Sequence, residues 1–122
     1  MAVAWPEVRG WVLALPGCRE VFVEQWGDWT LRYGEKMFVV GGPEHDTVSV
    51  KASLDEQAEL VASAPDTYSP APYVGRYGWV RVVLAEADAA ELRQVVTDAW
   101  RRTASKKAVR EYDSAQGQAD QG

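Results

Sequence analysis

Apolar residues recur with the period of an α-helix near both ends of the chain. The first series predicts a helix over residues 6–15, which the Pro16-Gly17 pair ends. The second series follows Asp88 and Glu91, which are spaced as a helix cap, and it predicts the last helix. The two series consist of Val8, Trp11, Val12 and Leu15, and of Leu92, Val95, Val96, Ala99, Trp100 and Thr103.

The middle of the chain alternates between apolar and polar positions, which is the period of a β-strand. This pattern predicts strands over 19–24, 29–33, 36–40, 48–52 and 79–84. Gly34 and Glu35 fit a two-residue hairpin turn. Ser53 and Glu56 are spaced as a capping box and predict one more helix, from residue 54 to about 63. The order of these elements predicts an α+β fold, with a mainly antiparallel sheet and helices packed on one face.

The predicted sheet has a second face that the helices do not cover. If Leu31, Val50 and Val82 point into the core, alternation places on the opposite face Thr30, Arg32, Ser49, Lys51, Trp79 and Arg81. Such a face suits an anionic or planar ligand, because cations bind phosphate and aromatic rings stack on bases. The alternative interpretation is that a sheet face exposed to water carries polar residues in any case.

The segment 70–80 is the most distinctive part of the chain. It contains three aromatic residues, two prolines, two glycines and one arginine, and it contains no acid. Proline restricts the backbone and glycine permits sharp turns, so a stiff, aromatic and cationic loop leads into the strand that follows. Long loops in compact domains tend to be functional. We therefore expect a binding role for Tyr73, Arg76, Tyr77 and Trp79.

The charge of the chain bears on whether nucleic acid is a partner. The 13 basic and 18 acidic residues give a net charge of −5, which argues against strong non-specific affinity for DNA. The stretch 99–110 nevertheless has no acid and contains Arg101, Arg102, Lys106, Lys107 and Arg110. One interpretation is a patch that contacts phosphates. The other is that these cations end a helix, where the macrodipole favours them, and keep the protein soluble.

The length of 122 residues predicts one domain, over residues 1–112. The segment 113–122 has no large apolar residue and predicts a disordered tail. Cys18 is the only cysteine, so no disulfide forms within the chain, which is typical of a cytoplasmic protein. No apolar run approaches the roughly 20 residues that cross a bilayer, so we expect no membrane partner.

Catalytic and metal-binding patterns are missing from the sequence. His45 is the only histidine, and no set of cysteines and histidines has the spacing of a zinc site. The chain has neither a nucleophile elbow nor a Walker sequence. We therefore expect no metal, no cofactor and no catalytic residue.

Three segments together resemble the MmcQ/YjbR family in their order and spacing: Leu15-Pro16-Gly17, residues 48–51 and residues 71–80. The resemblance covers about residues 3–110. It implies a bacterial cytoplasmic protein without enzyme activity and with a CyaY-like (frataxin-like) sandwich. The family is labelled DNA-binding because of a proposed double-wing motif. Its typical positions appear here as Lys36, Lys51, Tyr73, Gly75, Trp79 and the basic end of the last helix.

Two hypotheses about function follow. In the first, the protein is a non-enzymatic binding protein that contacts DNA through the basic helix end and the sheet and loop surface. In the second, it is a protein- or small-molecule-interaction module that uses the aromatic loop 70–79. The candidate ligand- or nucleic-acid-binding residues are Arg32, Lys36, Lys51, Tyr73, Arg76, Tyr77, Trp79, Arg81, Arg101, Arg102, Lys106 and Lys107.

Overall fold

The computed structural model describes residues 2–121, with side chains over residues 2–117. Met1 and Gly122, which belong to the predicted domain and tail, lie outside the described residues. The elements follow in the order α1 (Trp5–Leu13), β1 (Cys18–Val23), β2 (Asp28–Tyr33), β3 (Lys36–Gly41), β4 (Thr47–Val50), α2 (Leu54–Ser63), β5 (Tyr68–Pro70), η1 (Gly75–Tyr77), β6 (Val80–Val83), η2 (Leu84–Glu86), α3 (Ala89–Thr103) and α4 (Lys106–Gln121).

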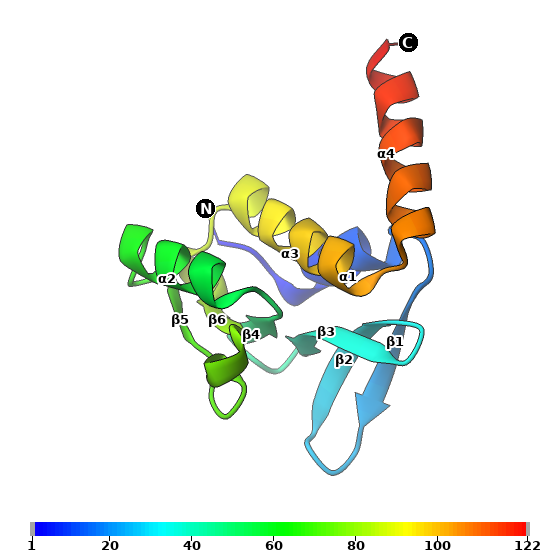
Figure 1. The fold of residues 1–122 in the computed structure, drawn as a ribbon. Helices are drawn as coiled ribbons and strands as arrows, with labels where there is room; N and C mark the ends of the chain where they lie inside the picture. The colour runs from blue at the N-terminus through cyan, green and yellow to red at the C-terminus, as the bar shows by residue number, and fades with distance from the viewer. Residues whose placement is uncertain (1, 122) are drawn as a thin grey trace.

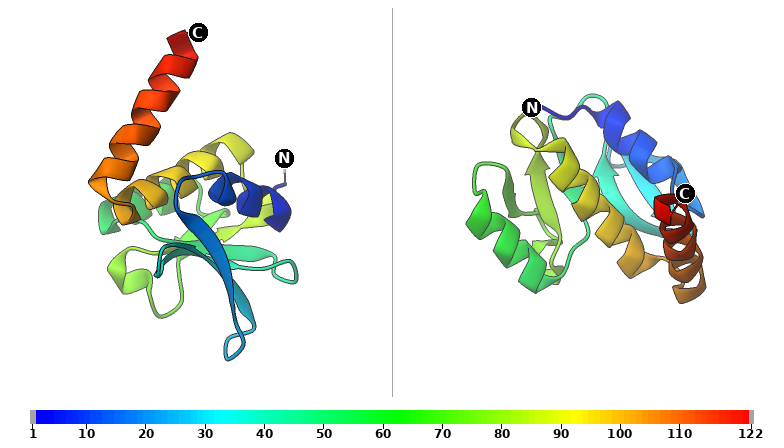
Figure 2. Two further views of the ribbon diagram at one scale, coloured as in Figure 1. Left: turned by 90° about the vertical axis from the view of Figure 1, so that its right-hand side faces the viewer. Right: turned by 90° about the horizontal axis from the view of Figure 1, so that it is seen from above.

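The six strands form one antiparallel sheet in the order β1-β2-β3-β4-β6-β5. Helices α1, α2 and α3 lie on one side of this sheet (Figure 1). In the left view of Figure 2, α1, α2, α3 and α4 lie on the same side of the strands, and α4 projects away from the body. The predicted α+β single domain, with its antiparallel sheet and one-sided helices, is therefore confirmed.

The strand residues that the alternation predicts to be buried do face the core. Leu31, Val50 and Val82 are fully buried on the helix side. A bulge interrupts the pairing of β2 with β3 between Leu31 and Arg32. The bulge gives β3 one more residue than β2 at this point. As a result, Phe38 and Val39 are both fully buried, and the side chain of Val40 faces away from the helices.

Trp100 joins three parts of the helical layer. Its side chain is fully buried in the core. Its indole Nε1 donates a hydrogen bond to the carbonyl oxygen of Pro16 at 3.1 Å, in the turn that follows α1. Its ring also meets the ring of Tyr112 edge-on, with centroids 5.1 Å apart. Trp100 thus fixes α3 against both the turn after α1 and the start of α4.

The stretch 64–78, between the predicted helix 54–63 and the predicted strand 79–84, contains a strand that the sequence pattern did not show. β5 pairs with β6 at the edge of the sheet, where Ser69 lies opposite Arg81. Three residues are too few to display a period of two, and Pro70 argues against a strand except at a sheet edge. The edge position explains both why the strand forms and why the sequence did not reveal it.

The C-terminal segment differs from the prediction of a disordered tail over 113–122. Helix α4 continues to Gln121, so the described part of that tail is helical. The Ser105 hydroxyl accepts a hydrogen bond from the Ala108 backbone N–H and caps this helix, while Val109 and Tyr112 pack against the core. These contacts start a helix that favourable residues such as alanine and glutamine can extend.

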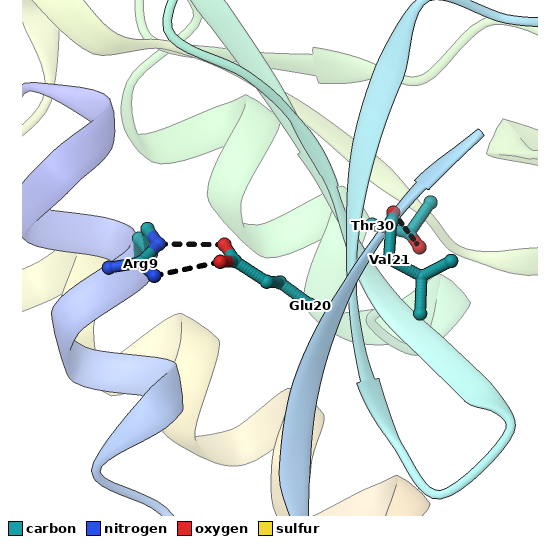
Figure 3. Close-up of polar contacts among 4 residues, drawn as sticks. All are labelled: Arg9, Glu20, Val21 and Thr30. Carbon is teal, nitrogen blue, oxygen red and sulfur yellow. Dashed lines mark hydrogen bonds and ion pairs between the residues drawn. The ribbon is translucent and has the colours of Figure 1, made fainter. Parts of the chain in front are cut away.

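An ion pair with two hydrogen bonds connects α1 to the first strand. Arg9 Nε and Nη2 each donate to one carboxylate oxygen of Glu20, both at 2.7 Å (Figure 3). On the adjacent strand, the Thr30 hydroxyl donates to the Val21 carbonyl oxygen at 2.8 Å (Figure 3). Hydrogen bonding from Arg9 holds the pKa of the Glu20 carboxyl below its ordinary value.

Glu20→Gln is expected to lower the melting temperature near neutral pH, because it removes the charge that Arg9 binds. The Glu20 pKa is lower in the folded protein, so its stabilisation is complete above the ordinary glutamate pKa and disappears as pH falls through the lowered value. Thermal unfolding of both proteins between pH 2 and 7 measures this difference. A deficit that stays constant down to the acid limit, or one matched by the exposed control Glu24→Gln, would contradict the assignment.

Candidate functional site

The tip of the β1–β2 hairpin presents a tryptophan to solvent. The backbone N–H groups of Trp26 and Gly27 both donate to the Val23 carbonyl oxygen, at 3.1 and 3.0 Å. Gly27 has a φ of 66°, a left-handed conformation that glycine adopts without steric cost. The turn leaves the Trp26 side chain 54% exposed.

Helix α2 holds the segment 71–79 in place through hydrogen bonds. Gln57 Nε2 donates to the carbonyl oxygens of Gly75 and Trp79, at 2.8 and 2.7 Å. Gly78 has a φ of 103°, and a Cβ there would lie 2.6 Å from the Ala52 carbonyl oxygen. Only glycine lets the loop pack this closely on the start of α2, so the predicted stiff loop has a tertiary anchor as well as a local one.

Tyr73 combines backbone strain with almost complete exposure. Its φ is 65°, the only positive value among the described non-glycine residues, and its side chain is 95% exposed. A bulky residue in this conformation is unfavourable by about 1–2 kcal/mol. Strain of this kind concentrates at binding and catalytic sites. The exposed ring contributes no buried packing to the fold that would offset the strain.

The hairpin tip and this loop stand on either side of a groove on the sheet face without helices. The groove has a volume of about 510 Å³. We call it the open-face groove, and its lining residues are Trp26, Asp28, Met37, Val40, Ser49, Pro72, Tyr73, Val74 and Trp79. The Trp79 side chain is only 8% exposed, and it borders the groove without belonging to the main core cluster. Figure 1 shows the hairpin and the η1 loop extending on the same side, below the sheet.

A smaller cavity of about 150 Å³ continues the groove toward the β3–β4 loop. We call it the polar end, and its lining residues are Asp28, Val40, Gly41, His45, Thr47, Ser49, Pro72 and Arg81. His45 Nε2 lies 2.8 Å from Asp28 Oδ1. Arg81 is exposed and forms no ion pair with any described residue. One cation is therefore available to a ligand.

Three of the predicted site residues line these cavities. Tyr73 and Trp79 border the groove, and Arg81 borders its polar end. Arg32 lies on the same face, but its Nε donates to the Thr30 hydroxyl and covers that fully buried residue.

The other predicted residues from the sheet and the loop lie outside the cavity walls: Lys36, Lys51, Arg76 and Tyr77. The Arg76 guanidinium stacks on the neighbouring Tyr77 ring at 4.8 Å from its centroid, and both side chains are exposed on η1. The structure therefore divides the aromatic loop into a part that borders the groove and a part that faces solvent.

The predicted basic helix end is split and largely neutralised. Arg101 pairs with Asp113 at 2.6 Å, Arg102 with Glu56 at 2.9 Å, and Lys107 with Glu111 at 4.0 Å. Lys106 and Lys107 lie in the first turn of α4, where the macrodipole disfavours cations, so the helix-termination interpretation does not hold for them. The end of α3 and the start of α4, which carry these residues, lie on the helix side of the sheet (Figure 1), and none of these residues lines the open-face groove.

Sequence reasoning missed several residues that line the groove: Trp26, Asp28, Met37, Val40 and Val74. Val40 lies opposite Ser49 within the predicted strand 36–40, so alternation alone would have found it. Asp28 lies one residue before the predicted strand 29–33, so extending that strand by one residue would have found it. Met37 reaches this face only because of the bulge, which no sequence signal marks.

Other chemical features of the described chain are few. Among the described residues, no three His, Cys, Asp or Glu side chains lie close enough together to hold a metal ion. No described helix is long and apolar enough to cross a bilayer. Burial raises the pKa of the Cys18 thiol to about 11, which keeps it protonated at neutral pH.

Comparison with known proteins gives a family and a fold. The YjbR family model matches residues 13–102. The uncharacterized proteins Mb2600 of Mycobacterium bovis and Rv2570 of Mycobacterium tuberculosis are each 35% identical to this chain over 72 residues, which is 57% of this chain. The chain spans about half the length of these curated relatives, since the match covers 55% of each.

A solved structure is also similar. The crystal structure of the Deinococcus radiodurans protein DR2400, described as a DUF419 domain, superposes with a TM-score of 0.75 at 18% sequence identity. The match covers 88% of this chain and 86% of that one. At this identity the similarity establishes the shared fold.

Gln57→Met is expected to loosen the aromatic loop, because methionine has a similar length but cannot donate to the Gly75 and Trp79 carbonyl oxygens. Loss of these bonds is expected to lower stability by about 1–2 kcal/mol. Hydrogen exchange of the Tyr77 and Gly78 amides should become faster, while exchange in β2 stays unchanged. Gln94→Met is the matched control, since Gln94 is exposed and its side-chain amide bonds Asp98 of the same helix rather than the loop. Equal loop exchange in both variants would contradict the anchoring role.

Proposed function

The chain belongs to the YjbR family, and we propose that it is a non-enzymatic binding module that holds a small planar anionic ligand in the open-face groove. The observation that carries this proposal is the meeting of three aromatic side chains from two separate segments at one groove. Trp26 comes from the hairpin tip, and Tyr73 and Trp79 both come from the loop that precedes β6. Pockets of about 300–1,000 Å³ with mostly apolar walls are typical of small-molecule sites.

The exposure of Trp26 and Tyr73 supports a ligand rather than a role in folding. Trp26 and Tyr73 leave large apolar surfaces in water although the helix side of the sheet is fully packed. Exposed apolar patches bordered by polar residues are typical of interaction sites. The strained backbone of Tyr73 adds to this argument, because a residue without strain would serve the fold better at that position.

The charge at the groove supports an anionic ligand. Arg81 lies opposite Ser49 on one neighbouring strand and Ser69 on the other, so its guanidinium is flanked by short hydroxyl side chains. A guanidinium without a protein partner binds a carboxylate or phosphate through two parallel hydrogen bonds. Arg32 and Lys51 on the same face add positive potential along the route to the groove.

Two observations support binding without catalysis. His45, the only histidine, is engaged by Asp28, and the thiol of Cys18 has a raised pKa and lies outside the groove walls. Neither group is arranged as a nucleophile with an adjacent base among the described residues.

DNA binding through the basic helix end has less support. Three of its four predicted contact residues already pair with acids of the same chain, namely Arg101, Arg102 and Lys107. The net charge of −5 adds long-range repulsion. The helix end and the groove lie on opposite sides of the sheet, so one duplex would not contact both.

We expect indole acetate, which combines a planar ring with a carboxylate, to bind the wild-type protein measurably in isothermal titration calorimetry. Tyr73→Ala should weaken this binding by about three- to tenfold, because a stacked aromatic pair contributes about 0.5–1.5 kcal/mol. Tyr77→Ala is the matched control, since Tyr77 is 63% exposed on the same loop but does not line the groove. Equal effects of the two substitutions would reject the groove as the site of indole acetate binding. No heat with the wild type at millimolar indole acetate would reject a planar anion as the ligand.

For DNA, we expect fluorescence anisotropy of a labelled short duplex to stay flat at micromolar protein, at about 50 and about 200 mM salt. Binding at the lower salt that disappears at the higher one would restore the phosphate-contacting interpretation. Charge reversal at Lys106, which forms no ion pair with a described residue, would then locate the contact.

A further inference from the structure

The polar end of the groove contains an acid and a base that face one cavity without pairing with each other. Asp28 and Arg81 both line it, yet no ion pair joins them in the described part of the chain. Asp28 uses Oδ1 to contact His45, and its Oδ2 has no hydrogen-bond partner among the described residues. The cavity therefore offers one negative and one positive group to the same occupant.

The two cavities share part of their walls. Asp28, Val40, Ser49 and Pro72 line both the groove and its polar end. A molecule whose charged groups lie between Asp28 and Arg81 can therefore extend an apolar group directly among Met37, Tyr73 and Trp79. The walls change from polar to apolar over the length of one small molecule.

This proposal rests on the proposed function for the location of the site, and it assigns a zwitterion in place of a simple anion as the ligand. We infer that the ligand is a free α-amino acid with a large apolar, preferably aromatic, side chain. Its carboxylate binds the Arg81 guanidinium, and its ammonium group binds the Asp28 carboxylate, which His45 holds in position. Its side chain occupies the apolar part of the open-face groove.

The pair of opposite charges argues against related ligands. A nucleotide brings two or more negative charges, and the Asp28 carboxylate would repel them at the polar end. A residue within a peptide carries neither charge, and a peptide terminus carries only one of the two. A free α-amino acid carries both an ammonium group and a carboxylate on the same carbon atom, beside one apolar side chain.

Three related compounds test the inference on the wild-type protein by calorimetry. L-phenylalanine has both charges, phenylpropionate lacks the ammonium group, and phenylethylamine lacks the carboxylate. We expect L-phenylalanine to bind about tenfold or more tightly than either analogue, since each loses one hydrogen-bonded charge pair. Because no substitution is needed, this comparison is decisive even if a variant fails to fold.

Two variants test which residue binds each charged group of the amino acid. Asp28→Asn should abolish the preference for L-phenylalanine over phenylpropionate, and Arg81→Gln should abolish its preference over phenylethylamine. Asp66→Asn and Arg93→Gln make the same charge changes at exposed positions outside both cavities and should leave all affinities unchanged. Melting temperatures show whether each variant is folded.

The outcomes separate this inference from the proposed function. If phenylpropionate or indole acetate binds as tightly as L-phenylalanine, and Tyr73→Ala weakens that binding, the groove is a site for planar anions and the amino acid is wrong. If none of these compounds binds the wild type at millimolar concentration, both the amino acid and the groove are rejected. Tighter binding of L-phenylalanine with loss of selectivity in both site variants supports the inference.

Discussion

The burial of Trp100 places the helices on one side of the sheet, and the candidate site depends on this one-sided cover. Its ring packs inside the core, and its hydrogen bond to the Pro16 carbonyl oxygen and its contact with Tyr112 fix α3 relative to the elements on both sides. Apolar residues from α1 and α3 fill the covered face completely. The opposite face receives no helix, so the residues that alternate outward there remain available to a ligand.

The sequence was sufficient to predict which face of the sheet these strand side chains lie on, but it was not sufficient to predict the groove between the hairpin tip and the aromatic loop. A period of two predicted that Leu31 and Val50 are buried and that Ser49 and Arg81 lie on the open face, and both are as predicted. The groove also needs the bulge that turns Met37 outward and the hairpin tip that carries Trp26. Both depend on how distant strands pair, which a local pattern does not contain.

The basic stretch near the C-terminus shows why charges counted along a sequence mislead. Five cations over twelve residues suggested one patch, yet a helix break before Ser105 separates them. Arg102 forms an ion pair with Glu56, which is 46 residues away in the sequence. Arg101 pairs with Asp113 on the following helix, α4. Pairing of this kind is a property of the fold, and it removes most of the positive potential that the sequence predicted.

The most direct test of a ligand site on the open face is a two-dimensional proton–nitrogen NMR spectrum that follows the six tryptophan indole N–H signals during titration with L-phenylalanine. The account predicts that the Trp26 and Trp79 signals shift, because these rings line the groove. The Trp100 signal should stay in place, since its N–H is bound to Pro16 inside the core. Unchanged Trp26 and Trp79 signals at saturating ligand, or shifts confined to residues 101–107, would contradict it.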